Sequence, residues 1–296
     1  MTDAATSPVL ASLPQSWQDW IADNLARGCS PLDMVNSMAR SGQYTLDVAR
    51  AALDEAVHAR AIGPGANVHA PDQAMPFIDT TRNRIMVDQR AIDVLFVLKS
   101  PQVILLGNVL DSGECDALVA HCDAGADSSS RYTRSTVTGA EDGASVVHEG
   151  RTSDMAFIAR GEAAIADRIE RRLALLSHWP ADRGEPFQLQ RYASTQEYRP
   201  HYDWLDPDAS GHRSHLARGG QRLATFILYL TDVEQGGGTV FPGLGLEVYP
   251  KKGSALWFLN TDPHHHPDHQ TLHGGAPVVQ GTKIIANKWL RQARYG

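Results

Sequence analysis

The last third of the chain consists of short apolar runs separated by turn residues. The segments are FQLQRYA (187–193), EYRPHYDW (197–204), LATFILYLTD (223–232), TVFP (239–242), LEVYP (246–250), GSALWFLN (253–260) and GTKIIANKWLRQ (281–292). Runs this short, bounded by glycine, proline and asparagine, are typical of β-strands. Amphipathic helical patterns precede them at residues 111–122 and 161–179. We therefore predict an α+β fold with a mainly β core, an antiparallel sandwich or barrel such as a jelly roll, flanked by helices.

The organisation of the chain changes near residue 65. Residues 1–62 carry short helical patterns, and residues 63–99 contain a linker rich in Gly, Pro and Asn and a lead-in to the β-rich domain at 100–296. Trp17, Trp20 and Tyr44 lie on the apolar helical stripes. We expect these stripes to be buried against another surface, because so small a unit lacks an adequate core. The β-rich domain is favoured over a second subunit or a macromolecular substrate, because the linker is short. A DNA-binding helix–turn–helix is disfavoured, since the segment is not basic.

The three cysteines, Cys29, Cys115 and Cys122, form neither a disulfide framework nor a C-x-x-C motif. Cys115 and Cys122 lie seven residues apart in DSGECDALVAHC, where Asp111 and Glu114 have the spacing of a capping box. This spacing places both thiols on the apolar face of a helix. We predict that they are buried as small apolar side chains and have no redox or zinc-binding role.

Charge and hydropathy exclude several classes of partner. The chain holds 27 Lys and Arg against 34 Asp and Glu, which gives a formal net charge of −7. There is no bulk basic field to attract nucleic acid or an anionic membrane surface, and no apolar run is long enough to span a bilayer. The N-terminal MTDAATSPVLASLPQ lacks the basic start and apolar core of a secretory signal. We therefore expect a cytoplasmic protein without nucleic-acid or membrane partners, and we leave a homodimer open.

The segment YRPHYDW places a histidine and an aspartate two positions apart at the end of a predicted strand. Residues i and i+2 of a strand point to the same face, so His201 and Asp203 should lie side by side. An isolated pair of this kind is more often a histidine oriented by a carboxylate, and a metal site needs a third ligand. His273 is the best candidate, because it begins a return to strand. The four histidines between residues 264 and 269 lie in a polar, proline-broken segment that indicates an exposed loop.

Two histidines and one carboxylate, with the remaining coordination positions open, are typical of non-haem Fe(II) oxygenases. A zinc hydrolase could use the same ligand types, but the H-E-x-x-H motif is absent. The chain also lacks a G-x-S-x-G elbow, and QGGGTVFPG lacks the G-K-[ST] of a phosphate-binding loop. Spacing alone leaves the iron oxygenase as one of the open interpretations.

Four blocks of the sequence resemble the prolyl 4-hydroxylase branch of the Fe(II)/2-oxoglutarate-dependent dioxygenases. They are LQRYASTQEYRPHYDW, GGQRLATFILYLTDVEQGGGTVFP, VYPKKGSALWF and TLHGGAPVVQGTKIIANKWLR. The blocks occur in the order of the family and with similar gaps, and the resemblance extends from about residue 100 to residue 296. It implies a double-stranded β-helix, which is a distorted jelly roll. Residues 1–62 have no counterpart in the pattern.

The resemblance also implies roles for individual residues. It implies that iron is held by His201, Asp203 and His273. It implies that Lys283 pairs with the distal carboxylate of 2-oxoglutarate, a buried lysine that gains a counter-charge from the co-substrate. The hydroxyl donors to the same co-substrate would be Tyr192 and Thr239. The substrate side of the pocket would be lined by Arg222 and Trp289.

The activity implied is hydroxylation of an unactivated C–H bond of a prolyl or other amino-acid residue. The reaction consumes O₂ and decarboxylates 2-oxoglutarate to succinate, with Fe(II) as cofactor and ascorbate as a supporting reductant. The same chemistry on a free amino acid or small natural product is an alternative, and a non-enzymatic metal-binding jelly-roll sensor is another. Lys283 favours the enzyme, because a sensor needs no cation beside a co-substrate. Residues 129–153, rich in serine and glycine, are predicted to form a lid over the substrate.

Overall fold

The computed structural model describes residues 9–26, 31–61, 75–124, 130–138, 145–262 and 264–296. Contacts within the chain divide it into two compact units, Met1–Pro71 and Asp72–Gly296, which are described separately here. In the described residues, no helix combines the length and apolar character that a membrane crossing requires. Cys29 lies outside the described residues.

The first unit contains four helices whose apolar stripes pack on one another. They are α1 (Val9–Ser12), α2 (Gln15–Ala26), α3 (Pro31–Arg40) and α4 (Leu46–Ala61). Ile21, Met38 and Leu53, from three different helices, are almost fully buried in one shared cluster. This differs from the expectation that the stripes need an outside surface, because the helices supply a small core to each other. Trp17 and Tyr44 pack edge to face beside that core, with ring centroids 5.5 Å apart.

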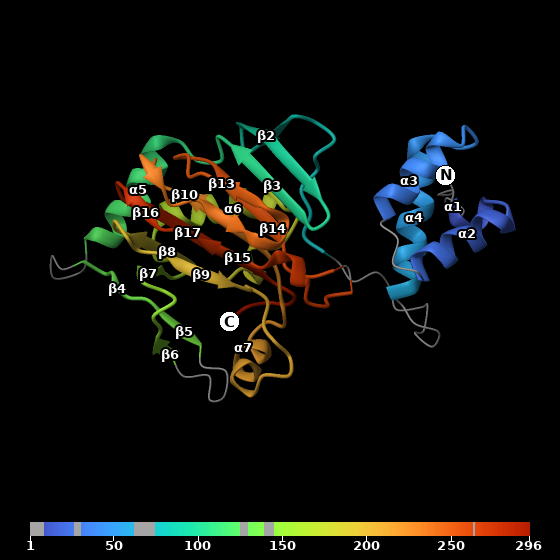
Figure 1. Cartoon of the computed structure of the whole chain (residues 1–296). Helices are drawn as coiled ribbons and strands as arrows, with labels where there is room; N and C mark the ends of the chain where they lie inside the picture. Colours follow the sequence, from blue (N-terminus) through green and yellow to red (C-terminus); the bar gives the residue numbers. More distant parts are fainter. Residues whose placement is uncertain (1–8, 27–30, 62–74, 125–129, 139–144, 263) are drawn as a thin grey trace. The chain divides into compact units, whose positions relative to one another are not determined.

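The second unit is built around a nine-stranded antiparallel sheet (Figure 1). In spatial order its strands are β1 (Arg84–Val87), β2 (Arg90–Lys99), β3 (Gln102–Gly107), β14 (Ala255–Leu259), β10 (Arg222–Tyr229), β17 (Lys283–Arg291), β8 (Phe187–Tyr192), β7 (Asp154–Ile158) and β4 (Thr133–Arg134). Strands β1 and β2 precede residue 100, where the sequence pattern places the start of this domain. Because they pair into the same sheet, β1 and β2 belong to the second unit, Asp72–Gly296.

A smaller antiparallel sheet belongs to the same unit. Its strands, in spatial order, are β13 (Leu246–Val248), β12 (Thr239–Phe241), β15 (His273–Gly275) and β9 (Tyr198–His201). Two further pairs are β11 (Gln235–Gly236) with β16 (Val278–Gln280), and β5 (Thr136–Thr138) with β6 (Ser145–Val147). Side chains of both sheets, such as Tyr229 and Phe241, share one buried cluster. The predicted jelly-roll core flanked by helices is confirmed.

Helices α5 (Ser112–Asp123) and α6 (Ala164–Leu176) cover the other face of the large sheet. The predicted capping box of Asp111 and Glu114 is present at the start of α5. Cys115 and Cys122 are fully buried on its apolar face, as predicted, and burial raises the pKa of each thiol to about 11. Thiols this hard to ionise are poor nucleophiles and poor metal ligands at neutral pH.

The alternation of side chains along the central strands separates an apolar face from a polar one. On β10, Phe226 and Leu228 join the cluster under the helices, whereas Ile227 and Tyr229 join the cluster between the sheets. Strand β17 is buried at all nine positions, so both of its faces are covered. Its odd-numbered residues, and the even-numbered residues of β8, therefore point toward the smaller sheet. This inner face carries the polar side chains of the site.

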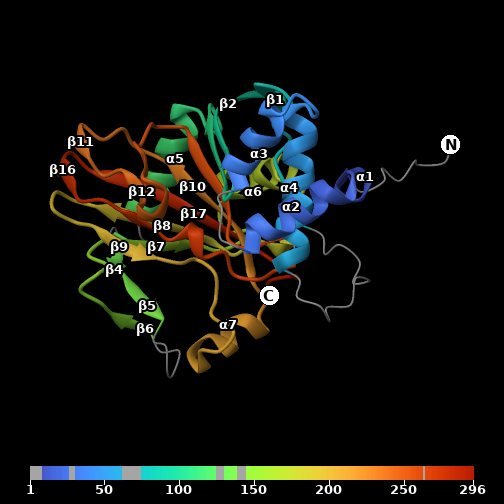
Figure 2. The same cartoon turned by 45° about the vertical axis from the view of Figure 1, so that its right-hand side comes forward.

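Three short elements complete the region near the smaller sheet. The hairpin of β5 and β6 and the helix α7 (Arg213–Ala217) lie on the same side of the sheets (Figures 1 and 2).

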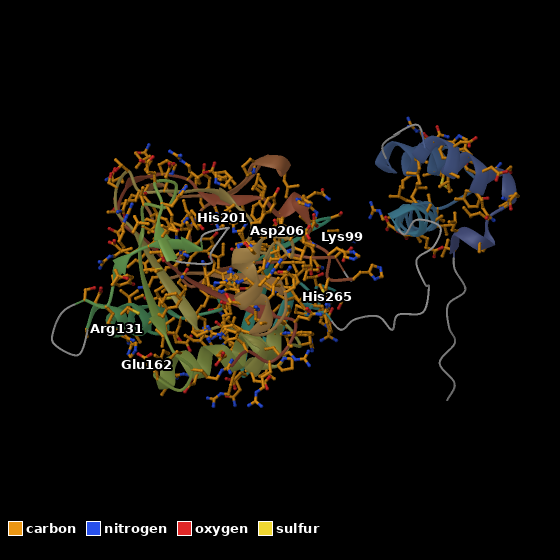
Figure 3. The ribbon with its side chains drawn as sticks, turned by 90° about the horizontal axis from the view of Figure 1, so that it is seen from below. Lys99, Arg131, Glu162, His201, Asp206 and His265 are labelled. Atoms are coloured by element: carbon orange, nitrogen blue, oxygen red, sulfur yellow. The ribbon has the colours of Figure 1, made fainter. Side chains whose placement is uncertain are left out.

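The chain that leads into β4 is anchored by Arg131, which pairs with Glu162 at the edge of the unit (Figure 3). This guanidinium lowers the pKa of Glu162 to about 2. The remaining short helices are the 3₁₀ turns η1 (Ala181–Arg183), η2 (Ser210–His212), η3 (Pro242–Leu244) and η4 (His269–Thr271).

Candidate metal and co-substrate site

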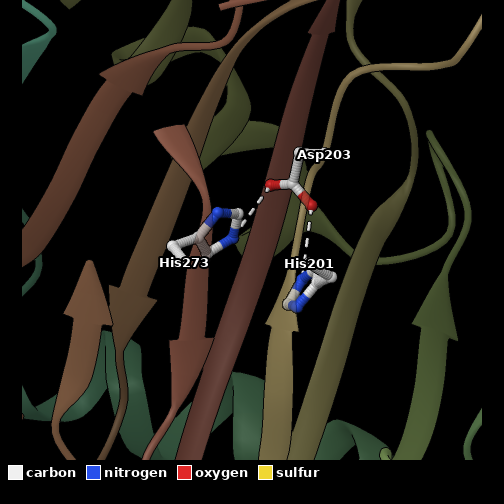
Figure 4. A group of neighbouring side chains, drawn as sticks. All are labelled: His201, Asp203 and His273. Atoms are coloured by element: carbon white, nitrogen blue, oxygen red, sulfur yellow. Dashed lines mark ion pairs between the residues drawn. The ribbon is translucent and has the colours of Figure 1, made fainter. Parts of the chain in front are cut away.

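His201, Asp203 and His273 converge on one point of the smaller sheet (Figure 4). His201 ends β9 and lies directly opposite His273, which begins β15. The Asp203 carboxylate faces both rings, with Oδ1 3.7 Å from His201 Nε2 and Oδ2 3.6 Å from His273 Nε2. One ligand atom from each residue lies within 4.8 Å of the others. In the described parts of the chain, no other group of three His, Cys, Asp or Glu side chains converges in this way.

The two neighbours in the H-x-D motif are not arranged as successive inward residues of one strand. Strand β9 ends at His201, and Asp203 lies in the bend that follows. The predicted proximity is present, but its origin is different, because the bend turns the carboxylate back toward the histidines. Asp203 and His273 are buried, and His201 is half-buried.

Hydrogen bonds fix both imidazoles in the form that binds a metal. His201 Nδ1 lies 3.0 Å from the Arg199 carbonyl oxygen, and His273 Nδ1 lies 2.9 Å from that of Thr271. A carbonyl only accepts hydrogen bonds, so each Nδ1 carries the proton and each Nε2 keeps its lone pair. Burial and the neighbouring His273 lower the pKa of His201 to about 3, which keeps this ring neutral. The Tyr198 ring stacks on it with a centroid distance of 3.6 Å.

The Asp203 carboxylate stays ionised although it is buried. Burial opposes ionisation, but the neighbouring His273 and His201 rings, Arg222 and the Thr225 hydroxyl together hold its pKa below the ordinary value. Thr225 Oγ1 donates a hydrogen bond of 2.8 Å to Asp203 Oδ2. Two neutral imidazoles and one carboxylate, with no further protein ligand, fit a divalent metal that keeps open coordination positions.

A cavity beside the triad contains the three residues expected to bind 2-oxoglutarate. Lys283, Tyr192 and Thr239 line it together with His201 and His273. Lys283 is 2% exposed, and among the described residues Nζ has no hydrogen bond or ion pair; the Tyr192 ring centroid lies 5.3 Å away. Burial lowers the pKa of Lys283 to about 7. A buried cation without a counter-charge is costly, so the cavity fits an anionic ligand.

The two hydroxyls in this cavity differ in what they offer a ligand. Tyr192 Oη donates to Gln190 Oε1, so its proton is already in use. Thr239 Oγ1 accepts a hydrogen bond of 2.8 Å from Tyr229 Oη, which leaves the Thr239 proton free to donate. The sequence pattern did not single out Gln190 or Tyr229. Strand alternation was the available signal, because Gln190 lies two residues before Tyr192 on the same face.

A larger groove adjoins this cavity and reaches the surface. It has a volume of about 350 Å³ and contains both residues expected on the substrate side, Arg222 and Trp289. The groove and the cavity share four lining residues: Gln190, Tyr198, His201 and Asn287. Thr136 and Val137, which belong to the described part of the predicted lid, line the groove. Residues 139–144 of that lid lie outside the described residues.

Arg222 and Trp289 form a stacked pair on a buried carboxylate. The Arg222 guanidinium lies 3.9 Å from the Trp289 ring centroid. Its Nε and Nη2 donate to the two oxygens of Glu185, at 2.6 and 3.0 Å. Arg291 Nη1 donates to the same carboxylate at 2.7 Å. Glu185 therefore binds two guanidinium groups, and Glu185 and Arg222 both line the groove.

The histidine-rich segment before His273 stays outside the triad. His266 Nδ1 lies 3.2 Å from Asp262 Oδ2, and the His269 ring packs edge-on against Trp204 with a centroid distance of 5.1 Å. Neither belongs to the converging ligand group. His212 and His215, from the other histidine-containing segment, line the groove.

The chain is similar to known proteins of one oxygenase family. A model of the 2OG-Fe(II) oxygenase superfamily matches residues 187–291, from the start of β8 to the end of β17. The chain is 35% identical over 214 residues to probable prolyl 4-hydroxylase 3 of Arabidopsis thaliana, which is 66% of this chain and 71% of that relative. It is 34% identical over 215 residues to prolyl 4-hydroxylase 2 of the same plant, which is 66% of this chain and 68% of that relative.

Among solved structures, the chain is similar to a viral collagen prolyl hydroxylase from Paramecium Bursaria Chlorella virus-1 in a 2OG complex. The match has 28% identity and a TM-score of 0.47, and covers 64% of this chain and 95% of the viral one. A jelly-roll core with two histidines and a carboxylate at one point defines the class of Fe(II)/2-oxoglutarate oxygenases. Within that class, the chain belongs to the prolyl 4-hydroxylase family. It is an enzyme of a family whose cofactors are Fe(II), 2-oxoglutarate and O₂.

Glu185 should stabilise the folded chain only while it is ionised. Burial opposes ionisation, but Arg222 and Arg291 together hold its pKa below the ordinary value. A carboxylate of this kind stabilises above its unfolded pKa of about 4.3, and the effect is lost as pH falls through the folded pKa. We expect Glu185→Gln to lower the free energy of unfolding at pH 7 by about 3–5 kcal/mol, measured by urea unfolding. The difference from the parent should shrink below about pH 4.3.

The matched control is Asp93→Asn, which breaks an ion pair with Arg84 at the surface, where the side chains are 36% and 66% exposed. Such a pair contributes at most about 1 kcal/mol, so this variant should stay close to the parent. A Glu185→Gln effect of equal size at pH 3 and pH 7 would contradict the role of its charge.

Proposed function

We propose that this chain hydroxylates a prolyl residue within a peptide or protein, using Fe(II), 2-oxoglutarate and O₂. The observation that supports this most directly is the triad of two neutral histidines and a carboxylate beside a buried, unpaired lysine. The triad and the lysine together fit one ligand that is bound at both ends. The triad would hold a metal with open positions, and the lysine would hold the far end of an anion that reaches that metal.

His201, Asp203 and His273 are the proposed iron ligands. The two Nε2 lone pairs and one Asp203 oxygen would hold the metal, and no further protein ligand among the described residues would fill its remaining positions. Bound iron supplies the oxidative chemistry that breaks an unactivated C–H bond while 2-oxoglutarate is decarboxylated. The protein holds both rings in one tautomer and keeps Asp203 ionised, so no proton has to be displaced before the metal binds.

Lys283 is the proposed partner of the distal carboxylate of 2-oxoglutarate. It lies in the same cavity as the triad, and this cavity also presents the Thr239 hydroxyl with its proton free. Tyr192 is the third proposed contact. Because its proton is used by Gln190, Tyr192 would accept a hydrogen bond from the charged lysine or exchange its partner when the co-substrate enters.

The groove next to the triad has the properties of a surface for a proline-containing peptide. Aromatic rings gather along it, and the buried indole nitrogens of Trp204 and Trp289 have no hydrogen-bond partner among the described residues. Flat rings pack against pyrrolidine rings, and indole N–H groups donate to the exposed carbonyls of a polyproline-type backbone. The relatives in Arabidopsis thaliana are named prolyl 4-hydroxylases, which supports the same substrate class here.

The finer properties of the enzyme are also part of the proposal. Ascorbate supports activity by keeping the iron reduced. A cytoplasmic location is supported by Cys115 and Cys122, which are buried free thiols. The net charge of −7 disfavours a nucleic-acid substrate or a membrane partner. The first unit is proposed to act as a separate helical domain, and a homodimer remains open.

Loss of any proposed iron ligand should abolish metal binding and turnover. We expect His201→Ala, Asp203→Ala and His273→Ala to keep the fold but lose bound Fe(II) and succinate formation, because two remaining ligands hold the metal weakly. Metal content after desalting and succinate release are the measurements. The control is His269→Ala, which removes a nearby histidine outside the triad and should keep both. The ligand assignment is wrong if His273→Ala retains iron and His269→Ala loses it.

Binding of 2-oxoglutarate should weaken as pH rises above 7. The pKa of Lys283 is about 7 in the ligand-free chain, and a carboxylate binds the charged form. We expect the Kd of 2-oxoglutarate, measured by calorimetry with Mn(II) in place of iron, to rise by up to about tenfold per pH unit above 7. Calorimetry in buffers of different ionisation enthalpy should show proton uptake.

The matched variant for this prediction is Lys283→Met, which keeps the length and apolar stem of the side chain. Loss of a charge-assisted hydrogen bond should weaken 2-oxoglutarate binding by about 10- to 100-fold and remove the proton uptake. Unchanged 2-oxoglutarate affinity in Lys283→Met would refute the assignment.

The substrate class is tested with purified protein, Fe(II), ascorbate and 2-oxoglutarate. We expect proline-rich peptides to gain the mass of one oxygen atom on proline, and free proline to remain unmodified. The same peptides with alanine at the modified position serve as controls. Trp289→Phe, which removes only the indole N–H and part of the ring, should raise KM for the peptide. Hydroxylation of free amino acids without any peptide product would favour the small-molecule alternative.

A further inference from the structure

Asn260 is a fully buried polar residue immediately after β14. Its Nδ2 donates a hydrogen bond of 2.9 Å to Thr225 Oγ1 on β10. Thr225 is also fully buried, and its hydroxyl donates to Asp203 Oδ2 at 2.8 Å. Three side chains from separate segments therefore form one buried chain of hydrogen bonds that ends on a proposed iron ligand.

The donor and acceptor roles along this series of hydrogen bonds are fixed by the charge of Asp203. The ionised Asp203 carboxylate can only accept, so the hydroxyl proton of Thr225 must point to Oδ2. The Thr225 oxygen then accepts, and the Asn260 amide supplies the donor. Asn260 thus holds the Thr225 hydroxyl in the rotamer that reaches Asp203. The Thr225 hydrogen bond restrains Oδ2, while Oδ1 faces His201 Nε2.

The backbone of Asn260 connects this series of hydrogen bonds to a second proposed iron ligand, His273. Its N–H donates to the Leu223 carbonyl at 2.8 Å, and its carbonyl accepts from the Asp268 N–H at 2.9 Å. Asp268 begins the turn η4, where its carbonyl accepts from the Thr271 hydroxyl at 2.7 Å. The Thr271 carbonyl in turn holds His273 Nδ1. Asn260 is therefore linked to Asp203 through one side chain and to His273 through one short turn.

We propose that Thr225 and Asn260 are positioning residues of the metal site. They fix the Asp203 carboxylate relative to His273, so that both ligands are in place before the metal binds. The inference rests on the proposed function, because it takes the triad as the metal site. Partners that orient metal ligands commonly change metal affinity by about 10- to 100-fold when they are removed. A freely rotating carboxylate would have to be ordered on each binding event, which weakens binding.

The test is metal affinity in the absence of turnover. Co(II) binding to the full chain is followed by visible absorption, which reports both the Kd and the ligand geometry. We expect Thr225→Val, which keeps the shape and removes the hydroxyl, to weaken Co(II) binding by about tenfold or more and to change the absorption spectrum. Thr225→Ser, which restores a hydroxyl, should return both toward the parent. Asn260→Ala should weaken binding less, by about threefold, because the Thr225–Asp203 bond can still form.

The matched control is Ser177→Ala, which removes a buried hydroxyl that donates to the Leu173 carbonyl at 2.7 Å, in the chain that follows α6. It should lower thermal stability without changing the Kd or spectrum of Co(II). A Thr225→Val variant that is less stable but binds Co(II) like the parent would overturn the inference. If Thr225→Val does not fold, Asn260→Ala decides, and parent-like Co(II) affinity and spectrum in that variant would overturn the inference.

The result also separates this inference from the proposed function. If the parent chain binds no Co(II), or if binding survives His273→Ala, the triad is not the metal site and both fail. If parent binding depends on the triad and is unchanged in Thr225→Val and Asn260→Ala, only the positioning role fails.

Discussion

Strand β17 is the constraint on which the second unit depends. All nine of its residues are buried, because α6 covers one face of the sheet and the smaller sheet covers the other. A strand in this position must place polar groups inside the protein whenever its sequence contains them. It contains three cations, Lys283, Lys288 and Arg291, each at most 3% exposed. The architecture around the strand follows from how these three charges are accommodated.

Two of the three cations have a carboxylate within the protein. Lys288 points to the helix side and pairs with Glu170 of α6. Arg291 pairs with Glu185, which lines the groove. Lys283 has no ion pair of this kind among the described residues, and burial lowers its pKa although the charge of Glu247 acts in the opposite direction. A buried ion pair roughly balances its own desolvation, whereas an unpaired charge does not. The folded chain thus carries an unfavourable charge at one position, which is the position that an anionic co-substrate would neutralise.

The sequence predicts the strand-rich fold, the capped helix α5 and the buried thiols, because each depends on local patterns of apolar and capping residues. Strand spacing made His201, Asp203 and His273 candidate metal ligands, and the resemblance to a known family then implied that the metal is iron. The sequence could not predict that Asp203 lies in a bend after β9, since a shift of two residues in the end of a strand leaves no mark on composition.

Sequence reasoning did not single out Thr225, Asn260 or Gln190, for a different reason. A threonine or asparagine in an apolar run usually indicates a polar group satisfied within its own sheet. Only the fold shows that these three donate to or accept from residues of the site. The alternation of β17 is hidden as well, because a strand buried on both faces has no period of apolar residues.

Buried polar atoms without a hydrogen-bond partner among the described residues occur in several parts of the second unit, and the groove is one of them. Buried donors and acceptors nearly always have partners, because an unpaired group costs the desolvation that burial imposes. Among the described residues, four side chains of the groove keep a buried polar atom without one: Arg151, Trp204, Asn287 and Trp289. All four line the groove beside the triad, and Asn287 also lines the cavity that contains Lys283. A ligand with acceptors and one donor would satisfy them together, so the groove that lowers the stability of the ligand-free fold is also the surface that can bind a ligand.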